Sequence, residues 1–212
     1  MQTYHSAERL PKEIRLRDMG SFYAGGQKIE ISGRNIIEIN VNEKCDRRII
    51  VDPNGSYQMG QMYVQYYIPE KIHGKYPLLL WHGGGMTGKS YETTPDGRPG
   101  WLSYFIRSGW KTYLSDAVER GRSSWCPYGE AFETMPTLFP EAYVFERFRL
   151  GKSFEEKSLF EGSRFPMNGF EEYAKEFVPR WTTTSELTVD AYCALLEKTG
   201  PSVIVAHSQG AS

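Results

Sequence analysis

The segment 206–210, Ala-His-Ser-Gln-Gly, constrains the fold of this chain more than any other. It directly follows an apolar run, Ser202–Val205. A buried strand that leads into small-x-Ser-x-Gly predicts a strained strand-to-helix turn with the serine at its apex. The turn closes only when the residues two before and two after the serine are small, and Ala206 in place of glycine adds a single methyl group. The pattern therefore predicts an α/β fold that exposes the hydroxyl of Ser208.

Composition excludes several classes of protein. Hydrophobic residues make up 40% of the 212 and charged residues 24%, which is typical of a globular domain. A formal net charge of -1 offers no electrostatic reason to expect a nucleic acid or membrane partner. No apolar run approaches the ~20 residues of a transmembrane helix, and residues 1–17 lack the apolar core of a secretory signal. We expect a soluble protein, cytoplasmic as the chain stands, or periplasmic or secreted if a leader was removed.

Cysteines and histidines show no clustering. Cys45, Cys126 and Cys193 are odd in number and include no CxxC pair, which argues against a disulfide framework or a thiolate zinc site. The histidines, at positions 5, 73, 82 and 207, are equally scattered. We therefore expect neither a metal ion nor another cofactor, and we expect Cys193 to be buried within an apolar helix.

Hydrophobic periodicity divides the chain into an antiparallel opening and a parallel remainder. Residues 21–24 and 28–31 flank Gly25-Gly26 and predict a β-hairpin, and residues 61–68 predict another strand. Alternating strands and helices then favour right-handed crossovers and a parallel sheet; these lie at 76–81, 101–108, 110–115, 186–198 and 202–205.

The helix over 186–198 has a predicted start and a predicted buried face. Thr183 and Glu186 have the spacing of a capping box. The apolar side chains share one face, which comprises Val189, Tyr192, Cys193 and Leu196.

Residues from Trp125 to Arg180 differ from the rest, being rich in Phe, Glu, Pro and Gly with weak periodicity. A connection this long in a compact domain is usually a lid or a functional loop. We expect residues 1–212 to belong to one domain with a lid or cap inserted at about 125–180.

A second chemical element follows the strand at 76–81, where the chain continues His82-Gly83-Gly84-Gly85. An attacking serine needs backbone donors for the oxyanion that forms, and glycines let the backbone approach a substrate closely. We assign these donors to the N–H groups of Gly84 and Gln209, with Gly85 as the alternative to Gly84.

Three neighbouring side chains have simpler interpretations than catalysis. His82 is expected to brace the glycine loop by hydrogen bonding, and His207 to pack beside the sheet instead of acting as the base. The arginines of the segment 120–123, Arg-Gly-Arg-Ser, could face a pocket mouth, but surface salt bridges are the simpler expectation.

Together these stretches resemble the α/β-hydrolase superfamily. More narrowly, they are similar to the bacterial carboxylesterase family that includes an esterase with two adjacent cysteines in its oxyanion loop and the sulfonylurea-herbicide de-esterifying esterases. The matching segments are 20–26 (GSFYAGG), 61–64 (QMYV), 81–88 (WHGGGMTG), 92–100 (ETTPDGRPG), 120–123 (RGRS) and the turn at Ser208. Two departures stand out: Gly84 and Gly85 occupy the place of the paired cysteines, and Glu119 replaces the first glycine of the family's D-x-x-G-R-G-R-S.

The resemblance implies an α/β-hydrolase fold in which a glutamate and the histidine base both follow the serine in chain order. Only four residues follow Ser208. We therefore expect this chain to be the N-terminal part of a larger hydrolase, completed by a C-terminal part that carries the histidine and the acid. Relatives also suggest a homodimer.

The expected activity is that of a serine carboxylester hydrolase that forms an acyl-enzyme. Trp81, Trp101, Trp125 and the Phe-rich insertion favour a small hydrophobic or aromatic ester. A non-catalytic ligand-binding protein of the same fold is the alternative, as is a serine hydrolase of amides or lactones, because a fold does not specify the bond that is cleaved.

Overall fold

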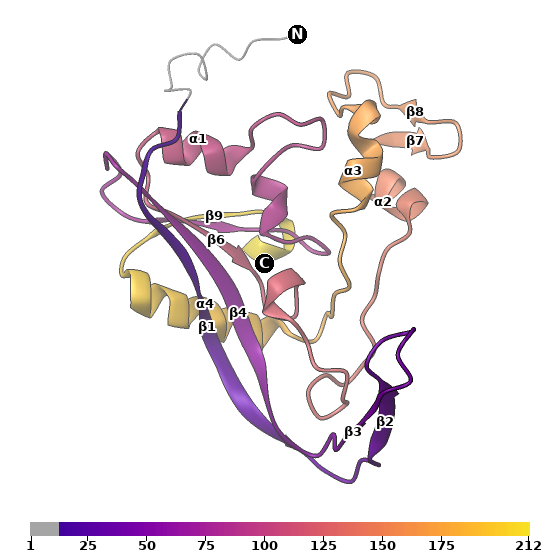
Figure 1. The fold of residues 1–212 in the computed structure, drawn as a ribbon. Helices are drawn as coiled ribbons and strands as arrows, with labels where there is room; N and C mark the ends of the chain where they lie inside the picture. Colours follow the sequence, from indigo (N-terminus) through magenta and orange to yellow (C-terminus); the bar gives the residue numbers. More distant parts are fainter. Residues whose placement is uncertain (1–12) are drawn as a thin grey trace.

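The computed structural model describes residues 13–212 (Figure 1). None of the described helices is long and apolar enough to cross a membrane. The strands are β1 (Leu16–Ile31), β2 (Ile37–Asn40), β3 (Arg48–Val51), β4 (Gly55–Pro69), β5 (Leu78–Trp81), β6 (Thr112–Asp116), β7 (Gly151–Ser153), β8 (Ser158–Leu159) and β9 (Val203–Ala206). The α-helices are α1 (Trp101–Arg107), α2 (Glu141–Arg147), α3 (Phe170–Ala174) and α4 (Ser185–Thr199). Short 3₁₀ turns occupy Gly88–Tyr91, Gly121–Ser123, Met167–Gly169 and Ser208–Ala211.

The main sheet has five strands in the order β1-β4-β6-β5-β9. β4 pairs antiparallel with both β1 and β6, whereas β5 pairs parallel with β6 and with β9. The α/β fold expected from the sequence is confirmed. The parallel pairs bring the carboxyl ends of β5 and β9 together, and the glycine loop and the Ser208 turn follow these two ends.

The predicted hairpin around Gly25-Gly26 is wrong. Both glycines lie inside β1, which continues to Ile31 and pairs along its length with β4. Their φ angles are 66° and 96°, in the region that favours glycine. A Cβ on Gly25 would lie 2.9 Å from the Cα of Ala191 in α4. The glycines therefore let a long strand bend under a helix, where the local pattern alone suggested a turn.

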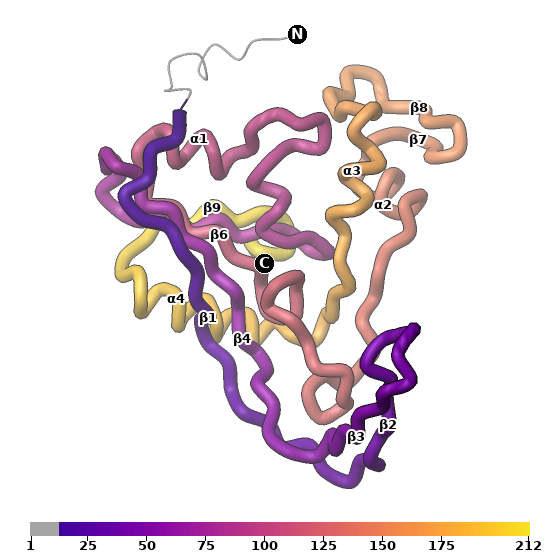
Figure 2. The backbone as a smooth tube through the Cα atoms, viewed as in Figure 1, coloured from indigo at the N-terminus to yellow at the C-terminus, as the bar shows by residue number. Residues whose placement is uncertain are grey.

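Two helices cover the two faces of the sheet (Figure 2). Leu79 belongs to a buried cluster with Ala191, Tyr192 and Leu195 of α4. Leu78 and Leu80 point to the opposite face, where they cluster with residues of α1 that include Leu102 and Ile106. Because β5 is covered on both faces, its sequence is continuously apolar.

The predicted start and face of α4 need correction. The helix begins after Thr184, which makes no side-chain capping hydrogen bond to the helix. The residues buried on α4 are Ala191, Tyr192 and Leu195, whereas Cys193 is exposed and Val189 is 51% exposed. Tyr192 is buried as predicted and Leu196 packs partly buried against the core, but the centre of the buried stripe is shifted by about one position. The direction of α4 over the sheet decides which side chains are covered.

Between Thr137 and Arg180, the elements α2, β7, β8 and α3 are grouped together beside the sheet, and we call residues 137–180 the inserted layer (Figure 1). The two connections to this layer are joined by a backbone bridge. The N–H of Thr137 donates to the carbonyl of Arg180 at 2.8 Å, and the N–H of Arg180 donates back at 3.0 Å. The inserted layer therefore leaves and rejoins the rest of the fold at one place.

Candidate active site

Ser208 stands at the apex of a strained turn at the end of β9. Its φ is 53°, in the left-handed region that L-residues rarely adopt, and the residue is exposed. Backbone strain of this kind costs of order 1–3 kcal/mol and clusters at functional positions. Within residues 13–212 the Oγ of Ser208 makes no hydrogen bond. The predicted turn is present, and its hydroxyl is accessible.

Gly210 shows why the turn requires a small residue on its far side. A Cβ at this position would lie 2.7 Å from Cδ1 of Trp81 and 2.8 Å from the carbonyl oxygen of His82. The turn is also held to the end of β5 by a hydrogen bond of 3.1 Å from the N–H of His207 to the carbonyl of Trp81. Any larger residue at position 210 would push the serine away from the glycine loop.

The glycine loop lies directly against the serine turn. A Cβ on Gly83 would lie 3.3 Å from the Cβ of Ser208, and one on Gly84 would lie 2.9 Å from Oε1 of Gln209. The N–H groups of Gly84 and Gln209 donate to no other described residue, so both are available to a ligand oxygen. The structure thus brings together the three residues that the sequence singled out.

His82 braces the glycine loop, as expected. The ring is 2% exposed; its Nε2 accepts from the N–H of Ala117 at 2.9 Å, and its Nδ1 lies 2.8 Å from the carbonyl of Gly83. Since Nε2 accepts, the proton belongs on Nδ1. Burial lowers the pKa of His82 to about 4, so the ring is neutral near pH 7.

His207 does not pack beside the sheet as expected. It is exposed, and its Nδ1 lies 2.8 Å from where a Cβ on Gly83 would be. The ring therefore rests on the glycine loop. No hydrogen bond connects it to the hydroxyl of Ser208.

No family model matches the sequence. A fungal protein described as the probable secreted lipase phiG, from Fungal sp. strain ATCC 74256, is 32% identical over an alignment of 172 residues; the match covers 74% of this chain and 45% of the relative. A structure described as that of a novel bacterial esterase is 31% identical, with a TM-score of 0.77 over 94% of this chain and 62% of the other. The chain belongs to an α/β-hydrolase esterase family. It spans less than half the length of the lipase that it matches.

The backbone conformation of Glu119 accounts for its departure from the family motif. Its φ is 63°, so Glu119 adopts the left-handed conformation that glycine readily adopts at this position in the family motif. The carboxylate is buried, and it accepts from the N–H of Trp181 at 3.2 Å and from the hydroxyl of Thr184 at 3.1 Å. Burial raises the pKa of Glu119, although the neighbouring Arg120 opposes the shift.

Arg120 is the main residue that the sequence analysis misplaced. It is 3% exposed, so the expected surface salt bridge is wrong for it. Its Nε is paired with the Glu119 carboxylate, and its Nη2 donates to Oε1 of Gln209 at 3.3 Å. Arg120 thus holds the side chain of the residue whose N–H is an assigned oxyanion donor. The charged pair at 119–120 directly after a strand end was the available signal.

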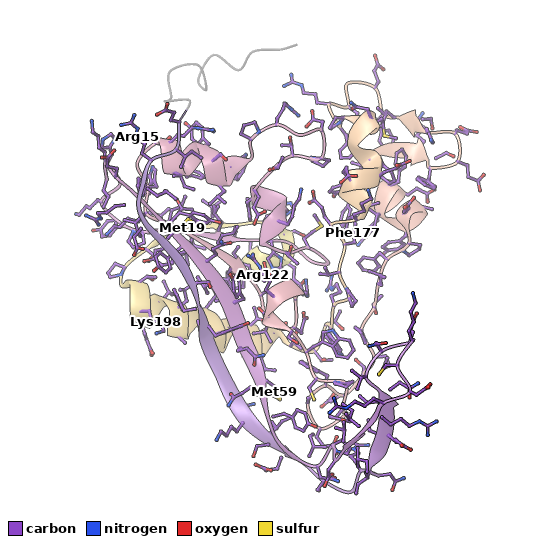
Figure 3. The ribbon with its side chains drawn as sticks, in the orientation of Figure 1. Arg15, Met19, Met59, Arg122, Phe177 and Lys198 are labelled. Carbon is purple, nitrogen blue, oxygen red and sulfur yellow. The ribbon has the colours of Figure 1, made fainter. Side chains whose placement is uncertain are left out.

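Arg122 makes a salt bridge, as expected for the arginines of this segment. It is partly exposed and makes an ion pair of 2.8 Å with the buried Asp116 (Arg122 is labelled in Figure 3). Burial opposes ionisation of Asp116, but hydrogen bonds from Arg122 and Gly88 outweigh it and hold its pKa below the usual value. Asp116 therefore ties the segment after the glycine loop to the 3₁₀ turn at Gly121–Ser123.

Of the tryptophans expected near the site, Trp81 lines a small cavity together with Gly83 and Gln209. The Trp81 ring also stacks on Tyr192, with ring centroids 3.5 Å apart, whereas Trp101 is 58% exposed on α1. Phe177 and Phe139 of the inserted layer approach the other end of the glycine loop, 3.5 and 3.7 Å from where a Cβ on Gly85 would lie. The apolar wall beside the site comes from the inserted layer.

Among residues 13–212, no group of three or more His, Cys, Asp or Glu side chains is placed to hold a metal ion.

The low pKa of His82 has a measurable consequence for stability. Between pH 6.5 and 4 the unfolded chain binds a proton at this ring and the folded chain does not, so stability rises with pH and is lost as pH falls through this window. We expect the ring to account for about 3 kcal/mol of acid destabilisation. Urea unfolding at pH 4.5 and 7 should show a smaller pH effect for His82→Gln than for the wild type. Equal pH effects in both would contradict a buried neutral ring.

Proposed function

We propose that this chain carries the nucleophile and the oxyanion hole of a serine carboxylester hydrolase. In this proposal the Oγ of Ser208 attacks the ester carbonyl, the alcohol leaves, and water hydrolyses the acyl-enzyme. The N–H groups of Gly84 and Gln209 donate to the tetrahedral oxyanion. The observation that carries the proposal is an exposed serine at φ 53° packed against a glycine loop whose N–H is free.

The base and the acid are proposed to come from polypeptide beyond residue 212. His82 cannot serve, because both ring nitrogens are engaged and burial holds its pKa near 4. The relatives support this division, since the chain matches 45% of the lipase and 62% of the bacterial esterase.

The proposed substrate is a small ester with an apolar or aromatic part. Phe139 and Phe177 support this, because their rings face Gly85 next to the assigned oxyanion donor. Each ring stacks on another aromatic residue of the insertion, Phe139 on Tyr143 at 4.8 Å and Phe177 on Phe148 at 5.8 Å between ring centroids. Ring stacking limits the freedom of these side chains and preserves an apolar surface.

The test uses the protein that carries this chain at its full natural length. We expect it to hydrolyse 4-nitrophenyl acetate and to be labelled by a fluorophosphonate, with the adduct mapped to Ser208 by peptide mass spectrometry. Labelling requires an activated hydroxyl as well as an accessible one. A protein that turns over no ester and takes up no label would be a binding protein, and the proposal would fail.

A further inference from the structure

A second guanidinium, that of Arg180, lies against the glycine loop. A Cβ on Gly84 would lie 2.5 Å from Nη1 of Arg180, so the guanidinium covers the loop at the residue assigned as an oxyanion donor. Arg180 comes from the far end of the inserted layer, 28 residues before Ser208. Nothing in the chemistry of attack by Ser208 requires a cation at this position.

Hydrogen bonds to three other segments hold the backbone around Arg180 in place. Thr137 exchanges two hydrogen bonds with it, the N–H of Val178 donates to the carbonyl of Gly85 at 2.9 Å, and the N–H of Trp181 donates to Glu119. The Trp181 ring is 2% exposed. The guanidinium is therefore carried on a stretch of chain that is bonded to the hydrolase core, and little ordering is needed when a ligand binds.

The charge of Arg180 is uncompensated in the described part of the chain. Glu119 is the buried carboxylate nearby, and Arg120 is already paired with it. Arg180 makes no ion pair within residues 13–212, and its Nε is buried without a hydrogen-bond partner. Burial, and secondarily the charge of Arg120, lower the pKa of Arg180. Of these two guanidinium groups only Arg120 is paired with the carboxylate, and a buried donor without a partner is costly.

We propose that Arg180 determines specificity by binding a carboxylate on the substrate, so that the preferred esters are monoesters of dicarboxylic acids. This inference rests on the proposed ester hydrolase function. A guanidinium presents parallel N–H donors that match the two oxygens of a carboxylate. The Nε is buried, so the donors are the two Nη groups, which donate to no other residue within 13–212 and of which Nη1 lies against Gly84. Phe139 and Phe177 offer an apolar surface for the carbon chain between carboxylate and ester.

The experiment compares two esters of equal length on the full natural protein: mono-4-nitrophenyl adipate, which ends in a carboxylate, and 4-nitrophenyl hexanoate, which ends in a methyl group. Rates are corrected with the Ser208→Ala protein, because the free carboxylate can assist hydrolysis. We expect kcat/KM to favour the charged ester in the wild type. In Arg180→Gln this preference should fall by about ten- to a hundredfold, mainly through KM, while the neutral ester changes less than about twofold.

Two controls distinguish the alternatives. Arg147→Gln removes the same charge from an exposed position on α2 and should leave the preference unchanged, and Arg180→Lys should retain part of it. Equal losses for both esters in Arg180→Gln would mean that Arg180 stabilises the oxyanion or pairs with residues beyond 212, and would overturn the proposal. So would a wild type without preference for the charged ester. If neither ester nor 4-nitrophenyl acetate is hydrolysed, the proposed function itself has failed.

Discussion

Replacement of Ser208 by alanine is expected to lower kcat/KM for 4-nitrophenyl acetate by at least about a thousandfold in the full natural protein. Removal of a serine nucleophile abolishes the covalent route and leaves only what the oxyanion donors and binding can do. The free energy of unfolding should change little, because the exposed hydroxyl makes no hydrogen bond within residues 13–212. Steady-state kinetics check the loss of activity, and urea unfolding of the same preparation checks the unchanged stability.

A glycine at the same position is the matched control. Alanine keeps a Cβ at a φ of 53°, whereas glycine adopts this conformation without the steric cost. We expect Ser208→Gly to be as inactive as Ser208→Ala but more stable by about 1 kcal/mol. Turnover by either variant close to that of the wild type would remove Ser208 from the mechanism. Equal stability of the two variants would show that the backbone at position 208 is not strained.

Glu119→Ala is expected to lower the free energy of unfolding by about 3–5 kcal/mol, as when one partner of a buried ion pair is removed. Arg120 would be left 3% exposed without its counter-charge. The N–H of Trp181 and the hydroxyl of Thr184 would also lose their acceptor. Because Arg120 holds Oε1 of Gln209, we expect kcat to fall as well. Chemical denaturation and ester kinetics are the measurements.

The double variant Glu119→Ala with Arg120→Met identifies the cause. Replacing both members of a buried pair by neutral side chains is much less costly than removing one of them. We expect the double variant to recover most of the lost stability but not the activity, since Gln209 would still lack its hydrogen bond from position 120. A double variant as unstable as Glu119→Ala would show that the ion pair is not what stabilises this region.

Features that depend on one short segment were predictable from the sequence. The serine turn needs small residues at 206 and 210, and the structure shows Gly210 packed against Trp81 and the backbone of His82. The apolar strand and the glycine loop after it were predictable for the same reason. Burial on both faces requires a continuously apolar strand, and close approach of the backbone requires glycine.

Features that depend on a distant segment were not predictable. Gly25-Gly26 carries a turn signal, yet it serves a bend in β1 beneath Ala191 of α4. Arg120 lies in a polar run typical of the surface, yet it is 3% exposed and donates to Gln209 at the serine turn. Each of these positions depends on a partner tens of residues away, Ala191 for Gly25 and Gln209 for Arg120, and a short segment does not reveal such a partner.

The sequence by itself determined the α/β fold, the exposed Ser208 and its glycine loop, because strained turns and doubly covered strands restrict which residues can stand there. Only the tertiary structure decided which charges surround that serine. The return of the inserted layer brings Arg180 onto Gly84 and hydrogen-bonds Trp181 to Glu119. Electrostatic environment is a property of distances in space, and these distances arise when the insertion docks on the sheet.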